Sequence, residues 1–86
     1  MMNLDFTTII ERRDSPKNLA RFYAISIEAT LLGGWAVVRR WGRIGTAGRT
    51  LVHLFEDPRD AVSMYLILLA RKRRRGYVTR ESPPPA

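Results

Sequence analysis

The chain contains no cysteine, a single histidine and no long apolar run. Without cysteine it can form neither disulfides nor thiolate metal sites, which is compatible with a reducing compartment. Its longest nearly apolar stretch, residues 61–70, is too short for the ~20 residues that cross a bilayer. The N-terminus carries Asp5 early and lacks a basic-then-apolar pattern, so no signal peptide is predicted. We therefore expect a cytoplasmic protein, nucleoid-associated if it binds DNA, without a membrane partner.

Residues for catalysis are also scarce. The histidine, His53, falls within a strand pattern, and the nearest carboxylate, Glu56, falls on the opposite face of that strand. Asp57 and Asp60 are better explained by the start of a helix than by acid–base or metal chemistry. No serine stands in a nucleophile-elbow context. The sequence thus predicts a non-enzyme without metal or cofactor, to which a protein partner would supply any enzymatic activity.

Positive charge is what the chain has in excess. Among its 86 residues, 15 are Lys or Arg and 8 are Asp or Glu, a formal net charge of +7. So basic a chain implies an anionic partner, nucleic acid first. Only Lys17 and Lys72 are lysines, and arginine both grips phosphate and stacks on bases. A GC-rich genome is the alternative source of the arginine bias, although it leaves the charge unchanged.

Four strand patterns precede a single helix pattern. The strands are predicted over Met1–Arg13, Arg21–Ala29, Trp35–Ile44 and Arg49–Glu56 from β-branched residues and period-two alternation. Asp14-Ser15-Pro16, Gly33-Gly34 and Gly45 to Gly48 contain the residues that favour the intervening turns. Gly42, inside the third strand, indicates a bulge or a close backbone approach.

The helix is predicted to begin after Asp57, which can cap the free amides, with Pro58 at its first position. At 3.6-residue spacing, Ala61, Tyr65, Leu68 and Lys72 form one stripe that should cover the sheet. Leu66 and Ile67 fall at its edges; either the chain termini half-bury them or they form a homodimer surface. Gly76 is expected to end the helix.

This order predicts an α+β fold, with a four-stranded antiparallel sheet and one C-terminal helix packed across one face. Residues 1–80 are expected to form a single domain. Residues 81–86 include three prolines and are predicted to form a flexible tail.

Aromatic and cationic residues concentrate around Trp41-Gly42-Arg43-Ile44-Gly45. An aromatic ring beside fixed positive charge suits a nucleotide, because the base or sugar stacks while the phosphate pairs. The run Arg71–Arg75 complements the helix dipole, but it exceeds what capping needs and predicts a phosphate-binding edge. The predicted nucleic-acid-binding residues are Arg21, Arg39, Arg40, Trp41, Arg43, Arg49, Arg73, Arg74, Arg75 and Tyr77.

With these features the chain resembles the WGR domain family, named for the tripeptide found here at residues 41–43. The series also includes Asn18–Tyr23, Leu32–Trp35, Gly48, Ala61 and Lys72–Tyr77, in family-like order and spacing. The resemblance implies a small α+β module like those that bind DNA strand breaks in poly(ADP-ribose) polymerases, and here a stand-alone bacterial type.

In that family the tripeptide's tryptophan packs against a nucleotide at the break, which implies this role for Trp41. By the same resemblance Arg43 would contact DNA or another domain, and Arg21 would contact phosphate. The polymerase's catalytic domain is absent from the sequence, so ADP-ribose transfer is not implied. Arg40 stands where bacterial relatives often carry an acidic residue and Arg49 where glutamine is frequent, so both make this edge more positive.

We therefore predict a non-catalytic nucleic-acid-binding module that recognises strand breaks or ends through Trp41 stacking and arginine–phosphate contacts. The resemblance favours DNA over RNA, which the residues themselves do not distinguish. The alternative from a different class is a protein-interaction module that binds an acidic partner or self-associates, in which Trp41 is structural.

Overall fold

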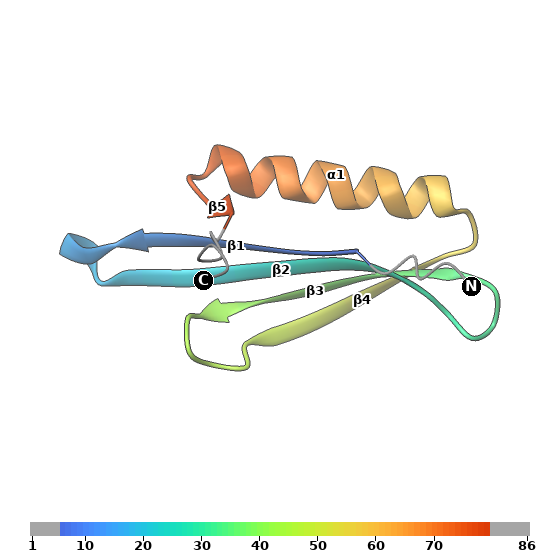
Figure 1. The fold of residues 1–86 in the computed structure, drawn as a ribbon, viewed down its shortest axis with the longest axis horizontal. Coiled ribbons are helices and arrows are strands. Elements are labelled where there is room, and N and C mark those ends of the chain that lie inside the picture. Colours follow the sequence, from blue (N-terminus) through green and yellow to red (C-terminus); the bar gives the residue numbers. More distant parts are fainter. Residues whose placement is uncertain (1–5, 80–86) are drawn as a thin grey trace, which may run out of the picture.

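The computed structural model describes residues 6–79 of the chain. They form an antiparallel sheet with strand order β4-β3-β2-β1-β5, and a single α-helix lies along one face of it (Figure 1). The elements are β1 (Phe6–Asp14), the 3₁₀ turn η1 (Ser15–Lys17), β2 (Leu19–Ala29), β3 (Trp35–Arg43), β4 (Arg49–Phe55), α1 (Pro58–Arg74) and β5 (Val78–Thr79).

The α+β architecture is confirmed, but the prediction of four strands is wrong because the sheet has five. After α1, Gly76 adopts a φ of +95° and reverses the chain. Val78 and Thr79 then pair with Glu11 and Ile10 on the outer edge of β1. A strand of two residues is too short to show alternation in the sequence.

The predicted strand boundaries differ from the observed ones by one or two residues. β2 begins at Leu19 instead of Arg21, β3 ends at Arg43 instead of Ile44, and β4 ends at Phe55. The predicted start of the first strand, residues 1–5, and the predicted tail, residues 81–86, lie outside the described residues.

The main core lies between α1 and the sheet. Tyr23, Ile25 and Ile27, which alternate along β2, are buried there. From the helix, Ala61 is fully buried, and it is joined by the partly buried side chains of Tyr65 and Leu68 from the predicted stripe and of Met64 and Leu69 beside it. The small Ala61 side chain lets the helix approach the sheet closely. Leu66 and Ile67 remain more than half exposed.

The helix start follows its sequence signals. The Asp57 carboxylate accepts a 2.8 Å hydrogen bond from the backbone amide of Arg59, and Pro58 occupies the first helical position. Tyr65, one helical turn beyond Ala61, exchanges a hydrogen bond with the hydroxyl of Thr8 and so ties α1 to β1. The start of α1 and its orientation over the sheet are thus fixed by contacts in its first turns.

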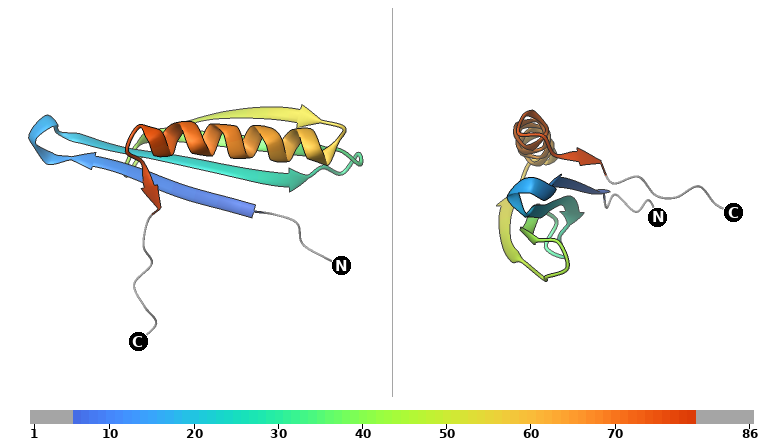
Figure 2. Two further views of the ribbon diagram at one scale, coloured as in Figure 1. Left: turned by 90° about the horizontal axis from the view of Figure 1, so that it is seen from above. Right: turned by 90° about the vertical axis from the view of Figure 1, so that its left-hand side faces the viewer.

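The sheet is strongly twisted, and its strands fan out when they are seen end-on (Figure 2). Its second face, away from α1, is also partly buried: Phe22 and Ala24 are each only 7% exposed. Among the described residues no helix has both the length and the apolar character that crossing a membrane requires.

Candidate nucleic-acid interface

A groove of about 360 Å³ opens where α1 ends over the sheet, and we call it the Trp41 groove. The antiparallel register builds it, because Arg12 lies opposite Arg21 and Tyr23 lies opposite Trp41 on neighbouring strands. The C-terminal turn of α1 closes one side. Its lining residues are Arg12, Leu19, Arg21, Phe22, Trp41, Gly42, Lys72, Arg75 and Tyr77.

Trp41 is half-buried and has two roles in the structure. It packs against the core cluster, and the Arg39 guanidinium carbon lies 5.5 Å from its ring centroid. It also lines the groove, together with Gly42. A ring that is fixed by packing and partly open to solvent is suited to stack on a base or sugar, because little conformational entropy is lost on binding.

The groove is strongly electropositive. No carboxylate is among the described residues that line it. The ammonium group of Lys72 lies 5.0 Å from the ring centroid of Tyr23 and 5.3 Å from that of Tyr77. Desolvation holds the pKa of Lys72 below its ordinary value of 10.5, and the charges of Arg75, Arg39 and Arg21 lower it further. An anion placed there would relieve this repulsion.

Arg39 is held within the structure. Its Nε donates a 3.0 Å hydrogen bond to the hydroxyl of Tyr23, and its Nη1 lies 3.4 Å from Nε2 of His53. Because Arg39 is half-buried and stacks on Trp41, it supports the indole and adds positive charge beneath the groove. Arg39 is absent from the residues that line the groove.

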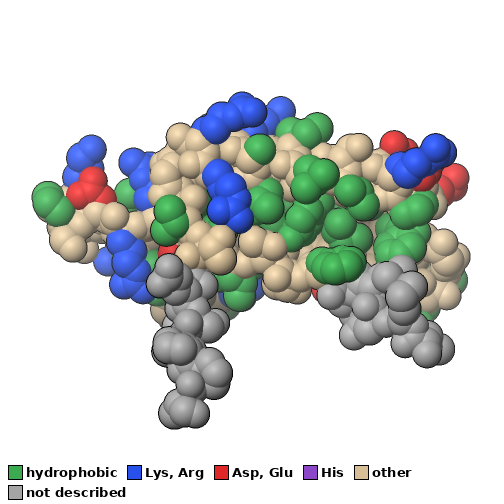
Figure 3. All heavy atoms as spheres, turned by 45° about the horizontal axis from the view of Figure 1, so that its top comes forward, with side chains coloured by type: hydrophobic (Ala, Val, Ile, Leu, Met, Phe, Trp, Pro, Cys, Tyr) green, Lys and Arg blue, Asp and Glu red, His purple; other side chains and the backbone are tan. Residues whose placement is uncertain are grey.

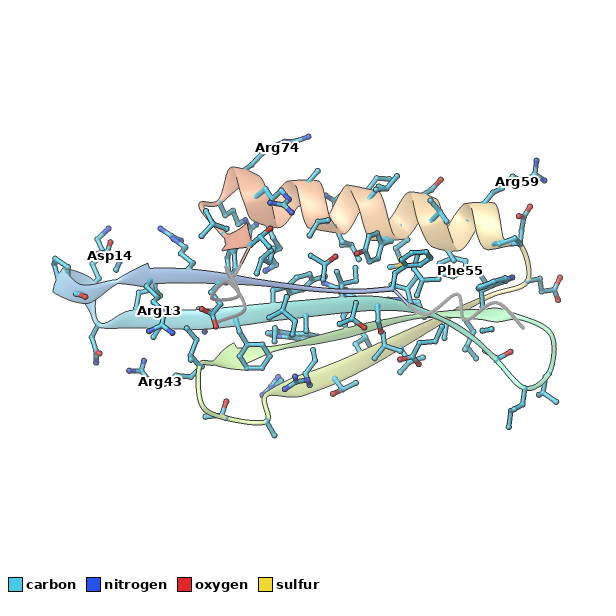
Figure 4. All side chains as sticks on the ribbon, viewed as in Figure 1. Arg13, Asp14, Arg43, Phe55, Arg59 and Arg74 are labelled. Atoms are coloured by element: carbon cyan, nitrogen blue, oxygen red, sulfur yellow. The ribbon has the colours of Figure 1, made fainter. Side chains whose placement is uncertain are left out.

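Arg43 ties the end of β3 to the turn before β2. Its Nη1 donates a hydrogen bond to the carbonyl oxygen of Asn18, and its Nη2 donates one to the Asn18 side-chain oxygen. Both donor–acceptor distances are 3.2 Å. Asn18 has a φ of 51° in the left-handed region, which asparagine tolerates well. Figure 4 shows Arg43 at the same end of the molecule as Arg13 and Asp14.

Steric crowding explains why the residue between Trp41 and Arg43 is a glycine. A Cβ built on Gly42 would lie 2.8 Å from the Cα of Gly48, in the turn between β3 and β4. Gly48 itself lies against the backbone of Trp41 and the ring of Phe22. The close approach predicted at Gly42 is confirmed, and it holds this turn tightly behind Trp41.

The remaining predicted residues divide between two faces and the helix end. Arg40 lies on the face away from α1, where its guanidinium carbon is 4.8 Å from the Phe22 ring centroid and its Nη1 donates to the Ala47 carbonyl oxygen. Arg49 is exposed and lies opposite Trp41 on the edge strand β4. Arg73 donates a 3.0 Å hydrogen bond to the hydroxyl of Thr79.

Arg74, in contrast, points away from the sheet (Figure 4). The fold therefore gathers four predicted residues in one groove, namely Arg21, Trp41, Arg75 and Tyr77. It places the other six outside that lining.

The predicted binding residues omit two cations of the groove, Arg12 and Lys72, although Lys72 lies within the run Arg71–Arg75 that was predicted to bind phosphate. Both had a usable signal. Arg12 alternates with Ile10 on the core face of β1, so the β1–β2 hairpin was bound to bring it near Arg21. Lys72 belongs to the sheet-facing helical stripe, which separates it from the outward-facing arginines beside it.

Basic and acidic side chains are unevenly distributed over the surface of the molecule. Lys and Arg side chains gather toward the end of the molecule that holds the C-terminus of α1, whereas hydrophobic side chains gather on the flank between α1 and β1 (Figure 3). The acidic residues Glu56, Asp57 and Asp60 lie at the other end, around the start of α1. Each end therefore carries an excess of one charge, although Arg59 pairs with Asp57 at the acidic end and Asp14 lies at the basic end (Figure 4).

A small α+β module with an electropositive aromatic groove is the class of protein that these features define. The chain belongs to the WGR domain family, whose model matches residues 6–84. The WGR domain is a known type of nucleic-acid-binding module in proteins like the poly(ADP-ribose) polymerases.

Over 84 residues, 98% of this chain, the sequence is 46% identical to the uncharacterized protein y4dW of Sinorhizobium fredii (strain NBRC 101917 / NGR234). The aligned region is 41% of that relative, so the chain spans less than half of the relative's length. No solved structure shows significant similarity to the chain.

Proposed function

We propose that this protein binds DNA through the Trp41 groove, with a preference for strand breaks or ends. The observation that carries the proposal is the juxtaposition of Trp41 with Arg12, Arg21, Lys72 and Arg75, in a groove whose described lining contains no carboxylate. The cations supply phosphate contacts, and the indole supplies a stacking surface that an exposed terminal base or sugar can use.

The break preference follows from the position of the indole. Trp41 is half-buried in a groove at the C-terminal end of α1. It does not project outward, as a side chain that intercalates between stacked base pairs would. An interior base pair presents no face to such a ring, whereas a nick or a blunt end does. Base-specific readout is not part of the proposal, since α1 uses its long face for the core.

Fluorescence anisotropy tests this function with nicked, blunt-ended and covalently closed duplexes over a salt series. We expect tighter binding to the nicked and blunt duplexes, and a loss of that preference in Trp41→Ala. Equal affinity for all three duplexes, unchanged in Trp41→Ala, would refute end recognition. Tighter binding to a matched RNA duplex would assign the groove to RNA instead.

Two arginines near the same helix end provide the matched control. Arg75→Gln removes a cation that lines the groove, and Arg74→Gln removes its neighbour, which points away. Removing one phosphate-binding cation should reduce the slope of log affinity against log salt by about 0.9. We expect that reduction for Arg75→Gln and a much smaller one for Arg74→Gln. Equal reductions would indicate diffuse electrostatic attraction without a defined groove.

A further inference from the structure

The strand β4 forms one edge of the sheet, and no described strand pairs with its outer side. Edge strands usually carry protection against pairing, such as lysines, prolines, bulges or a covering segment. β4 reads Arg-Thr-Leu-Val-His-Leu-Phe and contains neither lysine nor proline, and its one charged residue is Arg49 at its start. On the opposite edge, β5 covers part of β1.

Both faces of this edge also expose apolar side chains. Leu51, on the α1 side, is 43% exposed; Val52 and Leu54, on the other side, are 50% and 74% exposed. Apolar side chains beside a row of unpaired backbone groups are the features that a further β-strand recognises. The edge therefore has both components of a strand-addition site, main-chain hydrogen bonds and side-chain contacts.

We propose that β4 pairs antiparallel with β4 of a second copy of this chain, around a twofold axis at His53. A twofold axis normal to the sheet keeps each face of the sheet on its own side, so a residue can lie only opposite residues of its own face. Centring the axis on His53 sets Leu51 opposite Phe55 of the second copy. It also sets Val52 opposite Leu54.

The charges fit the same register. Arg49 falls opposite Asp57 of the second copy, two residues beyond the end of β4, where a carboxylate that already pairs with Arg59 at 2.9 Å would face a second cation. A register centred on Val52 would instead place Arg49 opposite Phe55 and Thr50 opposite Leu54, leaving the charges unmatched and polar groups against apolar ones. Side-chain chemistry therefore selects the His53-centred register.

The polarised charge of the whole domain favours a second copy as the occupant of this edge. The antiparallel arrangement lays the basic end of each copy, with Arg49, beside the acidic end of the other, with Glu56, Asp57 and Asp60. Parallel pairing would instead set like ends together. In the antiparallel dimer both helices, and both Trp41 grooves, lie on the same side of one continuous sheet. If the proposed function holds, this dimer presents two nucleic-acid sites to one side.

Sedimentation velocity over a micromolar concentration series tests the contact. The wild-type chain should show a reversible monomer–dimer equilibrium, and Leu54→Lys should weaken it by about tenfold or more, since a charge would then be buried at the edge. Val78→Lys is the matched control: Val78 is 63% exposed on β5, at the opposite edge of the sheet, and should leave the dimer unchanged. Circular dichroism establishes that both variants are folded.

A monomeric wild type throughout the series would overturn the proposal. Loss of the dimer in Leu66→Lys but not in Leu54→Lys would also overturn it, because that result places the contact on the helix. Assemblies that grow beyond dimers would contradict the twofold axis.

The absence of cysteine allows a clean test of the register. His53→Cys places the sole thiol of each copy on the proposed axis, and mild oxidation should give a covalent dimer on a non-reducing gel. Thr50→Cys, which lies opposite Glu56 of the second copy in this register, should cross-link far more slowly. Faster cross-linking of Val52→Cys than of His53→Cys would refute the His53-centred register.

Discussion

Gly48→Ala is predicted to destabilise the domain severely, because this glycine has two separate constraints. Its φ of +73° lies in the left-handed region, where an alanine side chain costs roughly 1–2 kcal/mol. Its Cβ would also lie 2.8 Å from the carbonyl carbon of Trp41 and 2.9 Å from Cζ of Phe22. Those contacts are with backbone and a packed ring, so relieving them costs roughly a further 1–3 kcal/mol.

Gly33→Ala separates the two contributions. Gly33 has a similar φ of +89°, but a Cβ there meets nothing within 4 Å. It should therefore show the conformational strain alone, roughly 1–2 kcal/mol. The difference between the two variants then measures the packing of the β3–β4 turn behind Trp41.

Urea or thermal unfolding gives both values. In a domain of this size, each kcal/mol lowers the melting temperature by about 4–8 °C. Gly48→Ala should thus lower the melting temperature by about 8–40 °C, a large part of the stability of a small domain, whereas Gly33→Ala should remain well folded. Equal losses of stability in the two variants would refute the close approach of the turn to Trp41 and Phe22.

Three other outcomes are expected. Nucleic-acid affinity should fall as the pH rises through the pKa of Lys72, which lies below 10.5, because the neutral amine no longer binds phosphate; Lys72→Met should bind more weakly and lack this fall in an anisotropy titration. Arg43→Ala should lower stability by about 1 kcal/mol in urea because the Asn18 hydrogen bonds are removed, with Arg74→Ala unchanged. The Arg59 hydrogen bonds lower the pKa of Asp57 below 3.8, so their stabilisation is present above that pH and disappears as pH falls through the lowered value; in acid melts Asp57→Asn should lack this part of the decrease.

The sequence predicts most of this fold because local signals and burial agree over long elements. The alternation of β2 and the stripe of α1 both point to the core that the structure contains. β5 could not be predicted in this way, because its two residues are extended only by pairing with β1 after the turn at Gly76. Its existence depends on where α1 ends in space.

The candidate site was less predictable, since it depends on which cations the register brings together. The strand pattern assigned faces within each strand but did not relate the face of Trp41 to that of Arg21. The β2–β3 register does so, because Tyr23 lies opposite Trp41, and both Trp41 and Arg21 line the groove. It could not show that Arg43 would be bound to Asn18, because that contact joins residues separated by a turn and a whole hairpin. Arg40 was predicted to bind because of its charge and its position beside Trp41. As the neighbour of Trp41 in a strand, however, it points to the opposite face of the sheet, away from the groove.

The most direct test of the central claim uses the fluorescence of Trp41. The chain has two tryptophans, and Trp35→Phe leaves Trp41 as the only one. When this variant is titrated with nicked duplex DNA, Trp41 emission should be quenched with the same dissociation constant that anisotropy gives. The converse variant, Trp41→Phe, retains Trp35, which packs against the core outside the groove, and should show no change in emission. Saturating anisotropy without any change in Trp41 emission would contradict binding in the Trp41 groove.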